Sequence, residues 1–304
     1  MNHFDRRIFL RNSAATLLLG SAALATKDAF ASPWGLPIGL QLYSVRAMLA
    51  QDYAGTLRQI AAIGYREVEA AGFYNQSPQQ VKAAMSSAGL SCVGAHYSYN
   101  DLAKSLDQTI DFNHAIGTQY IICSFPGIRN PSRLKDHSFA NQVRSFTLDD
   151  YRFNADQFNI FGEKVAKAGM KFGYHNHTME FAPQNGVVPF QELIRLTNPS
   201  LVTFEMDCGW VKVGGGDPID YLHHFPTRIS LLHVKDFRPT TTPSSVVNPP
   251  PPAELGHGTM DYQPIFAAAK DTNIKHFYVE QEGFDMPPLD ALRIDLEYMK
   301  SLKG

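Results

Sequence analysis

The protein has 304 residues, of which 44% are hydrophobic and 18% are charged. This balance is typical of a packed globular protein and excludes a disordered or fibrous chain. The 27 Lys and Arg residues nearly match the 29 Asp and Glu residues, so the net charge is only −2. A general binding surface for nucleic acid or for anionic membranes is therefore not expected.

The first 31 residues have the pattern of an export signal. Arg6 and Arg7 precede an uncharged stretch over 13–26, and Ala29-Phe30-Ala31 has the small residues of a cleavage site. The paired arginines resemble a twin-arginine signal. The resemblance implies recognition by the twin-arginine translocation machinery, cleavage near Ala31 and a periplasmic or extracellular location. The alternative interpretation is an amphipathic N-terminal helix of the fold.

The uncharged stretch is also shorter than the roughly 20 residues that a membrane-spanning helix needs. No stable membrane insertion is therefore expected after cleavage. The removed segment carries four basic and two acidic residues, so the mature chain has a net charge of −4. This acidic balance again argues against nucleic acid as a partner.

Residues 32–304 alternate short apolar runs with longer segments of helical period. Strands are predicted at 38–42, 67–70, 92–96, 120–123, 171–175, 202–206, 229–234 and 276–280. Helices are predicted at 54–63, 78–88, 104–116, 150–168, 189–197, 217–225, 262–270 and 289–302, and several begin after a capping residue such as Ser77, Asp149 or Asp217.

Eight strand-then-helix units in one chain predict a single (β/α)₈ TIM barrel over residues 32–304. The competing architecture is an open doubly wound sheet. Such a sheet usually has a glycine-rich turn after its first strand, and residues 42–46 contain no glycine. Two long loops, 124–149 and 236–260, follow strand ends and are candidates for active-site lids or for contacts in a homo-oligomer.

Polar side chains gather where the predicted strands end. Because parallel strands of a barrel end at one mouth, these residues become neighbours. They include Glu69, His96, the run 175–177, Asp207, His233, Lys235 and Glu280. Together with Glu180, the last four strands offer three carboxylates and one imidazole, which suits one divalent ion such as Mn²⁺, Mg²⁺, Co²⁺ or Zn²⁺.

Four motifs carry a resemblance to a known family. They are Tyr174-His175-Asn176-His177-Thr178-Met179-Glu180-Phe181, Asp207-Cys208-Gly209-Trp210, His233-Val234-Lys235-Asp236 and Val279-Glu280-Gln281. In this order they resemble the xylose isomerase-like TIM barrels, a superfamily of sugar isomerases, epimerases, dehydratases and endonucleases. The resemblance implies one divalent metal held by Glu180, Asp207, His233 and Glu280. His175 is the alternative ligand from the fifth strand.

The resemblance also implies roles in catalysis. Glu280 is expected to be the base, Glu180 a second acid or base, and Lys235 a stabiliser of negative charge. The expected contacts with a carbohydrate substrate are His96, His177, Glu69, Asn176 and His257, although His257 stands where similar sequences often have Glu.

Three functions are compatible with such a site. The leading hypothesis is a sugar or keto-sugar isomerase or epimerase that removes a proton next to a carbonyl. The alternative is a lyase or dehydratase acting on a 3-keto-sugar, a 3-keto-glycoside or an inosose. A non-catalytic periplasmic sugar-binding barrel is the third hypothesis. Phosphodiester hydrolysis is disfavoured, because a basic groove is not expected on a chain of net charge −4.

Overall fold

The computed structural model describes residues 32–303, so the expected export signal at 1–31 lies outside the described residues. Eight parallel strands close into a barrel in the order β1-β10-β7-β6-β5-β4-β3-β2. Their bounds are β1 Gly39–Gln41, β2 Glu67–Ala70, β3 Ser91–Ser98, β4 Tyr120–Phe125, β5 Lys171–His175, β6 Val202–Asp207, β7 Ile229–Val234 and β10 His276–Val279. The predicted (β/α)₈ barrel is therefore confirmed.

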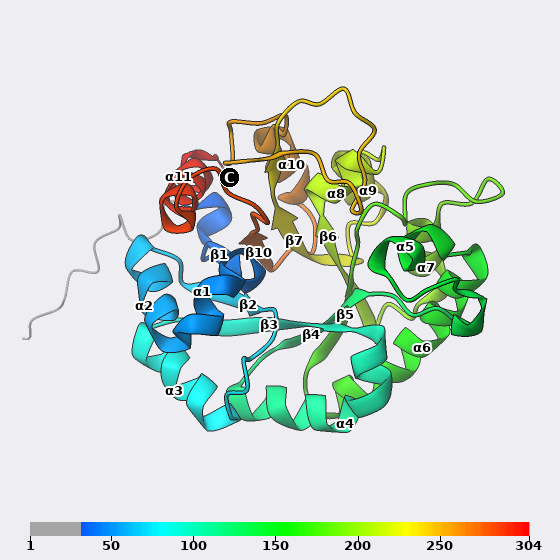
Figure 1. The fold of residues 1–304 in the computed structure, drawn as a ribbon, viewed down its shortest axis with the longest axis horizontal. Coiled ribbons are helices and arrows are strands. Elements are labelled where there is room, and N and C mark those ends of the chain that lie inside the picture. The colour runs from blue at the N-terminus through cyan, green and yellow to red at the C-terminus, as the bar shows by residue number, and fades with distance from the viewer. Residues whose placement is uncertain (1–31, 304) are drawn as a thin grey trace, which may run out of the picture.

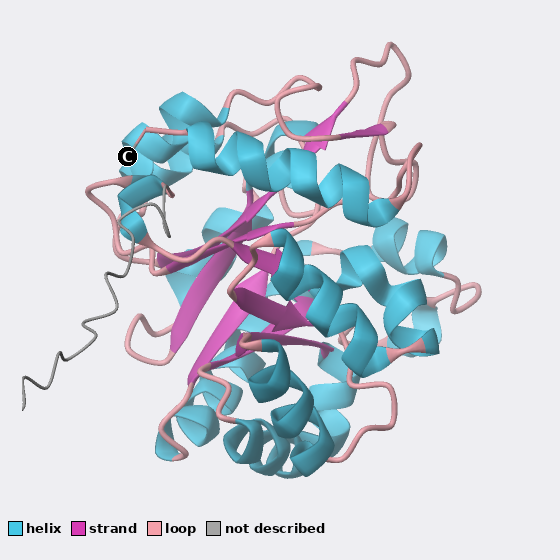
Figure 2. Ribbon diagram, turned by 90° about the vertical axis from the view of Figure 1, so that its left-hand side faces the viewer, coloured by secondary structure: helices cyan, strands magenta, loops and turns pink. Residues whose placement is uncertain are grey.

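The helices surround the barrel (Figures 1 and 2). Their bounds are α1 Arg46–Gln51, α2 Tyr53–Ile63, α3 Pro78–Ala88, α4 Tyr99–Ile116, α5 Phe139–Ser145, α6 Leu148–Lys167, α7 Pro189–Leu196, α8 Cys208–Val213, α9 Pro218–His224, α10 Tyr262–Ala269 and α11 Pro288–Ser301. The three short helices α1, α5 and α8 were not predicted, whereas the similarly short α9 was, because the capping residue Asp217 marks its beginning. Within residues 32–303 no helix is both long and apolar enough to span a bilayer.

Helix caps explain where several helices begin. Ser77 caps α3 in a reciprocal capping box with Gln80, and Asp217 caps α9. The prediction for α6 was wrong, since Thr147 and not Asp149 is its cap. The Thr147 hydroxyl accepts from the backbone N–H of Asp150, and the Asp150 carboxylate accepts from the Thr147 N–H at 2.8 Å. Asp149 lies in the first turn of α6, where a negative charge stabilises the helix dipole.

The barrel interior has two layers. Side chains alternate between the inside and the outside of each strand, so residues two apart on a strand share one face. A small apolar cluster fills the lower layer and contains Val93, Tyr120, Ile122, Leu231 and Tyr278. His233 and Glu280 follow Leu231 and Tyr278 by two positions each, so they lie one layer nearer the C-terminal mouth. The polar site therefore rests on an apolar base.

The long segment after β7 is held by hydrogen bonds. It contains a two-stranded antiparallel ribbon of β8 Asp236–Phe237 and β9 Pro252–Ala253. The Asp236 carboxylate accepts from the backbone N–H groups of Gly256, Gly258, Thr259 and Met260 at 2.8 to 3.2 Å. In Figure 1 this segment arches over the barrel beside α8 and α10.

Candidate active site

Four side chains from four strand ends form one cluster at the mouth of the barrel. They are His175 from β5, Asp207 from β6, His233 from β7 and Glu280 just after β10. One ligand atom from each lies within 4.8 Å of the others, and all four residues are buried. The Nδ1 of His233 lies 3.0 Å from the Glu280 Oε2 and 3.9 Å from the Asp207 Oδ2. The structure thus brings Asp207, His233 and Glu280, three of the four expected metal ligands, close together.

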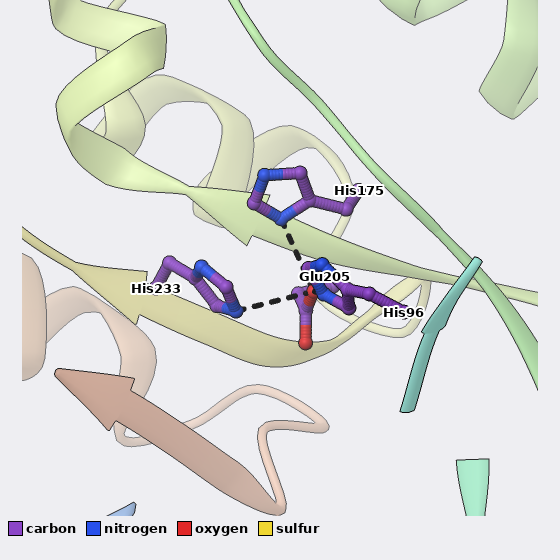
Figure 3. A group of neighbouring side chains, drawn as sticks. All are labelled: His96, His175, Glu205 and His233. Carbon is purple, nitrogen blue, oxygen red and sulfur yellow. Dashed lines mark hydrogen bonds and ion pairs between the residues drawn. The ribbon is translucent and has the colours of Figure 1, made fainter. Parts of the chain in front are cut away.

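A second, deeper group lies on the inner side of the same imidazoles and consists of His96, His175, Glu205 and His233. Figure 3 shows the rings of His175 and His233 directed at the Glu205 carboxylate. The Glu205 Oε2 lies 2.7 Å from His96 Nε2, 3.1 Å from His175 Nδ1 and 3.2 Å from His233 Nε2. The Oε2 of Glu69 lies 2.8 Å from His233 Nε2 and accepts from the Gln41 amide. Two buried carboxylates therefore hold the inner edges of these rings.

Lys235 lies against the outer cluster. Its Nζ lies 3.1 Å from Asp207 Oδ2, 2.9 Å from Glu280 Oε2 and 2.5 Å from Glu282 Oε1. Only 3% of the side chain is exposed, and its stem passes over Gly209, where a Cβ would come within 2.4 Å of the Lys235 Cγ. Gly209 in the Asp-Cys-Gly-Trp motif therefore leaves the space that Lys235 occupies.

A cleft of about 650 Å³ opens in front of the cluster. His96, His175, His177 and Glu280 line it from the barrel, and Tyr43, Phe125 and Phe139 are among the aromatic residues on its walls. The Nδ1 of His177 is buried and has no hydrogen-bond partner among the described residues. His96 and His177 are thus placed to contact a ligand, whereas Glu69 is fully buried beneath them.

Glu180 does not join either group. Its Oε1 accepts a hydrogen bond of 2.5 Å from the Tyr174 hydroxyl, and its Oε2 accepts from the His177 backbone N–H at 3.1 Å. The Tyr174 ring stacks on Phe158 of α6, so it points out of the barrel. His175, the next residue along β5, points inward. The loop after β5 brings Glu180 to the Tyr174 side, and His175 occupies the position that the sequence assigned first to Glu180.

Two further predicted contacts have other surroundings. His257 is exposed and lines a separate surface hollow beside α11, because the Gly256–Gly258 backbone turns its N–H groups toward Asp236. Asn176 is buried and links two strand ends, since its Oδ1 accepts from the Asp207 backbone N–H at 3.1 Å. Asn176 therefore positions Asp207 within the fold.

Sequence reasoning missed Glu205 and Glu282. Glu205 lies two residues before Asp207 on β6, so strand alternation places both carboxylates on the inner face. Glu282 lies two residues after Glu280 and forms an ion pair with Lys235. Each is a carboxylate two positions away from a predicted ligand, and this spacing is the sequence signal that identifies both.

Burial and neighbouring charge shape the protonation of the site. Burial raises the pKa of Asp207 to about 6, although Lys235 and His233 oppose the shift. Burial alone disfavours a charged Glu280, but Lys235 and His233 outweigh it and hold the pKa of Glu280 well below its usual range. Burial likewise disfavours a charged His96, yet Glu69 and Glu205 raise its pKa to about 9. The cluster therefore holds charged groups of both signs within a few ångströms.

The outer cluster has the donors that a divalent metal requires. Two imidazole nitrogens and two carboxylate oxygens can bind Mn²⁺, Co²⁺, Zn²⁺ or Mg²⁺, with affinities that differ between these ions. The Asp207 Oδ2 is buried and makes no hydrogen bond, although the Lys235 ammonium lies 3.1 Å away, so this oxygen still has the capacity to bind a metal ion. The inner ring nitrogens of His175 and His233 are bound to carboxylates, as in many metal sites where a carboxylate orients the imidazole ligand. These residues fit a metal ion.

Comparison with known proteins agrees with this arrangement. The sequence model of the family described as "Xylose isomerase-like TIM barrel" matches residues 57–302. An inosose dehydratase of Clostridium botulinum (strain Alaska E43 / Type E3) is 26% identical over 279 residues, which cover 80% of this chain and 87% of the relative.

Two solved structures have the same fold. A sugar phosphate isomerase/epimerase from Parabacteroides distasonis ATCC 8503 has 25% identity and a TM-score of 0.69, covering 86% of this chain and 96% of that one. A xylose isomerase-like TIM barrel protein from Mycobacterium smegmatis, solved in complex with magnesium, has 14% identity and a TM-score of 0.63, covering 88% and 97%. With its family match over most of the chain, this protein belongs to the xylose isomerase-like TIM barrel family.

Proposed function

We propose that this protein is a divalent-metal-dependent lyase that removes water from a cyclic keto-polyol or keto-sugar. The observation that carries the proposal is the buried group of His175, Asp207, His233 and Glu280 at the edge of a cleft lined by two more imidazoles. The dehydratase names of curated relatives support elimination over the isomerisation that the motifs favoured first. An inosose or a keto-glycoside is the proposed substrate class.

His175, Asp207, His233 and Glu280 would hold the metal. When bound, the ion supplies a positive charge beside the substrate carbonyl and lowers the cost of removing the neighbouring proton. His175 replaces Glu180 in this proposed ligand set, because Glu180 is bound to Tyr174 and does not lie with the other three side chains. The metal of the Mycobacterium smegmatis structure supports a divalent ion, and Mn²⁺, Mg²⁺, Co²⁺ and Zn²⁺ all remain in the proposal.

Glu280 is the proposed base. It lines the cleft and takes the proton from the carbon next to the carbonyl, while the Lys235 ammonium, 2.9 Å from its Oε2, stabilises negative charge nearby. The bond between the next carbon and its hydroxyl oxygen then breaks. His96 lines the same cleft, and its raised pKa makes it the imidazole that can give a proton to the departing oxygen, which leaves as water.

The test uses 2-keto-myo-inositol in deuterated water with added Mn²⁺. A dehydratase produces a conjugated ketone that absorbs in the ultraviolet and has lost the mass of one water. Glu280→Gln is expected to abolish this product, and a chelator is expected to do the same reversibly. A wild-type enzyme that neither exchanges the proton nor loses water with inososes or keto-glycosides would contradict the proposal and leave the sugar-binding barrel as the better interpretation.

Isomerisation or epimerisation is the second candidate function. It is favoured by the similarity to the sugar phosphate isomerase/epimerase and uses the same proton abstraction. The proton would return to the opposite face or to the neighbouring carbon in place of the loss of water. The same experiment distinguishes the two functions, because an isomerase or epimerase incorporates deuterium without loss of water.

We also propose that the protein is exported through the twin-arginine pathway and acts outside the cytoplasm. The support is the sequence of residues 1–31 alone. Substitution of both Arg6 and Arg7 by Lys is expected to retain the protein in the cytoplasm, and the exported wild-type chain is expected to begin near Ser32. Equal export of both forms would contradict this location.

A further inference from the structure

A second, smaller cavity is lined by Lys235 and shares Glu280 and Glu282 with the catalytic cleft. It measures about 190 Å³. Its apolar wall consists of the rings of Trp210, Phe237, Pro249, Pro250 and Pro252, and its polar wall includes Lys235, Asp236, Glu280, Gln281 and Glu282. Pockets for drug-sized ligands usually measure roughly 300–1,000 Å³, so this cavity suits a single ring.

The apolar wall is built on hydrogen-bonded structure. Phe237 and Pro252 face each other across the β8–β9 ribbon, and the Arg238 backbone N–H donates to the Pro251 carbonyl at 2.8 Å. The rings of Trp210 and Phe237 lie 5.1 Å apart between centroids. The proline run 249–252 is anchored by this ribbon and forms a preorganised side of the cavity.

The cavity adjoins the catalytic group. Glu280 and Glu282 line both this cavity and the main cleft. The ion pair between Lys235 and Glu282 lies at the shared wall. A substrate whose reacting ring occupies the cleft can therefore extend a substituent past this pair into the second cavity.

Two buried polar atoms of the cavity residues have no partner within the described chain. They are the indole Nε1 of Trp210, a donor, and the Oε1 of Gln281, an acceptor. Trp210 is 1% exposed and Gln281 is 4% exposed. Unsatisfied buried polar atoms are uncommon in proteins, and here both belong to residues that line the cavity.

We infer that this cavity is a second subsite that binds a pyranose ring attached to the reacting sugar. A pyranose combines an apolar C–H face, which matches the Phe237 and proline rings, with hydroxyl groups that can pair with the polar side chains of the opposite wall. The inference rests on the proposed function and narrows its substrate class to glycosides and disaccharides. An inosose lacks the second ring and leaves this cavity unfilled.

The chain offers a direct optical probe, because it contains only two tryptophans, Trp34 and Trp210. Trp34 stacks on Phe266 and does not line the cavity, so Trp34→Phe leaves Trp210 as the only tryptophan. This variant is titrated, in buffer with Mg²⁺, with methyl β-D-glucopyranoside, cellobiose, maltose and phenyl β-D-glucopyranoside. Circular dichroism confirms that the variants are folded.

One of the two disaccharides is expected to change the Trp210 emission with a Kd at least tenfold below that of the methyl glucoside. Gln281→Met is expected to raise the disaccharide Kd at least fivefold without affecting the methyl glucoside, while Gln59→Met, an exposed control on α2, has no effect. Equal affinity for one ring and two rings, no response to either disaccharide, or tighter binding of the phenyl glucoside overturns the inference.

The binding assay needs no turnover, so its outcome is separate from that of the proposed function. If disaccharides bind but no proton exchange occurs, the subsite is supported and the proposed lyase function is contradicted. If an inosose is dehydrated but disaccharides bind no more tightly than a single ring, the lyase function is supported and the subsite is contradicted.

Discussion

His233 Nε2 lies 2.8 Å from the Glu69 Oε2, on the side of the imidazole opposite to Glu280. The ring is thus held from below by a buried carboxylate while its Nδ1 faces the outer cluster. Glu205 completes the same support, because its Oε2 also contacts the inner nitrogen of His175. Both imidazoles of the proposed metal site are therefore oriented by fully buried carboxylates.

The first prediction concerns this support. Glu205→Gln removes the negative charge beneath both rings and is expected to weaken metal affinity about 10- to 100-fold, which is the usual effect of losing a carboxylate that orients an imidazole ligand. Isothermal titration with Mn²⁺ measures the change. Glu67→Gln is the matched control, since Glu67 also pairs with an imidazole, His276, at 2.8 Å but at the opposite end of the barrel. Equal metal affinity in E205Q and E67Q would show that Glu205 is dispensable.

The second prediction identifies the ligand from β5. His175→Asn is expected to lose most of the metal affinity, whereas Glu180→Gln is expected to keep it, because Glu180 points to Tyr174 and away from the cluster. Electron paramagnetic resonance of bound Mn²⁺ reports on both variants. The reverse result, with metal lost in E180Q and kept in H175N, restores the ligand set that the motifs alone implied.

Glu180 shows why the sequence predicts the fold better than the site. The strands 171–175 and 229–234 were predicted with their observed bounds, because apolar runs between helical segments mark buried parallel strands. The motif around Glu180 gives the residue types but not the path of the loop after β5. That loop follows the outward-pointing Tyr174 ring, and residue spacing does not show that the Glu180 carboxylate binds the Tyr174 hydroxyl.

Glu205 shows the opposite case, in which the signal was present. Residues two apart on a strand share a face, so Asp207 at the inner face of β6 already implies Glu205 beside it. Glu205 was not predicted, because it lies within β6 whereas the predicted site residues lie at strand ends. The short helix α8 was missed for a different reason, since its first turn depends on the Asp207 side chain accepting from the Trp210 backbone N–H at 2.8 Å.

The third prediction concerns Gly209. In Gly209→Ala the new Cβ would lie 2.4 Å from the Lys235 Cγ, near the rigid base of that side chain, so the ammonium must move. A displacement of about 1 Å at a catalytic group can cost about 100-fold in rate, and a loss of this order in kcat/KM is expected. The destabilisation is expected to stay within the roughly 1–3 kcal/mol of an overpacked core, as measured by urea unfolding.

A double-mutant cycle tests whether Gly209 acts through Lys235. Lys235→Met removes the ammonium, and Gly209→Ala in that background is expected to cause little further loss of kcat/KM. Independent, multiplicative losses would show that the glycine affects catalysis by another route.

The fourth prediction concerns Asp295 of α11, which is buried far from the proposed chemistry. Its Oδ1 accepts from the Leu255 backbone N–H at 2.7 Å, and its Oδ2 has no partner in the described chain. Burial, with Glu254 and Asp236 nearby, raises its pKa from 3.8 to about 7 against the effect of the Leu255 hydrogen bond. The folded state thus favours the protonated acid.

The sign of the pH effect follows from this raised pKa. The stability that protonated Asp295 contributes is complete below pH 4 and is lost as the pH rises to about 7, at about 1.4 kcal/mol per pH unit at most. Asp295→Asn keeps an acceptor for Leu255 but cannot ionise. We therefore expect the free energy of unfolding of D295N, relative to wild type, to increase between pH 4.5 and 7 and to level off above.

Urea unfolding at four pH values across this range measures the difference between the two proteins. Asp290→Asn on the same helix is the control, because Asp290 is 57% exposed and its substitution is expected to give a difference that hardly changes with pH. A pH-independent difference for D295N would mean that Asp295 is already ionised in the folded protein at pH 4.5, which requires a donor for its Oδ2. Because the five variants that probe the metal site and Lys235 leave α11 untouched, this measurement separates the stability of the barrel wall from the chemistry at its mouth.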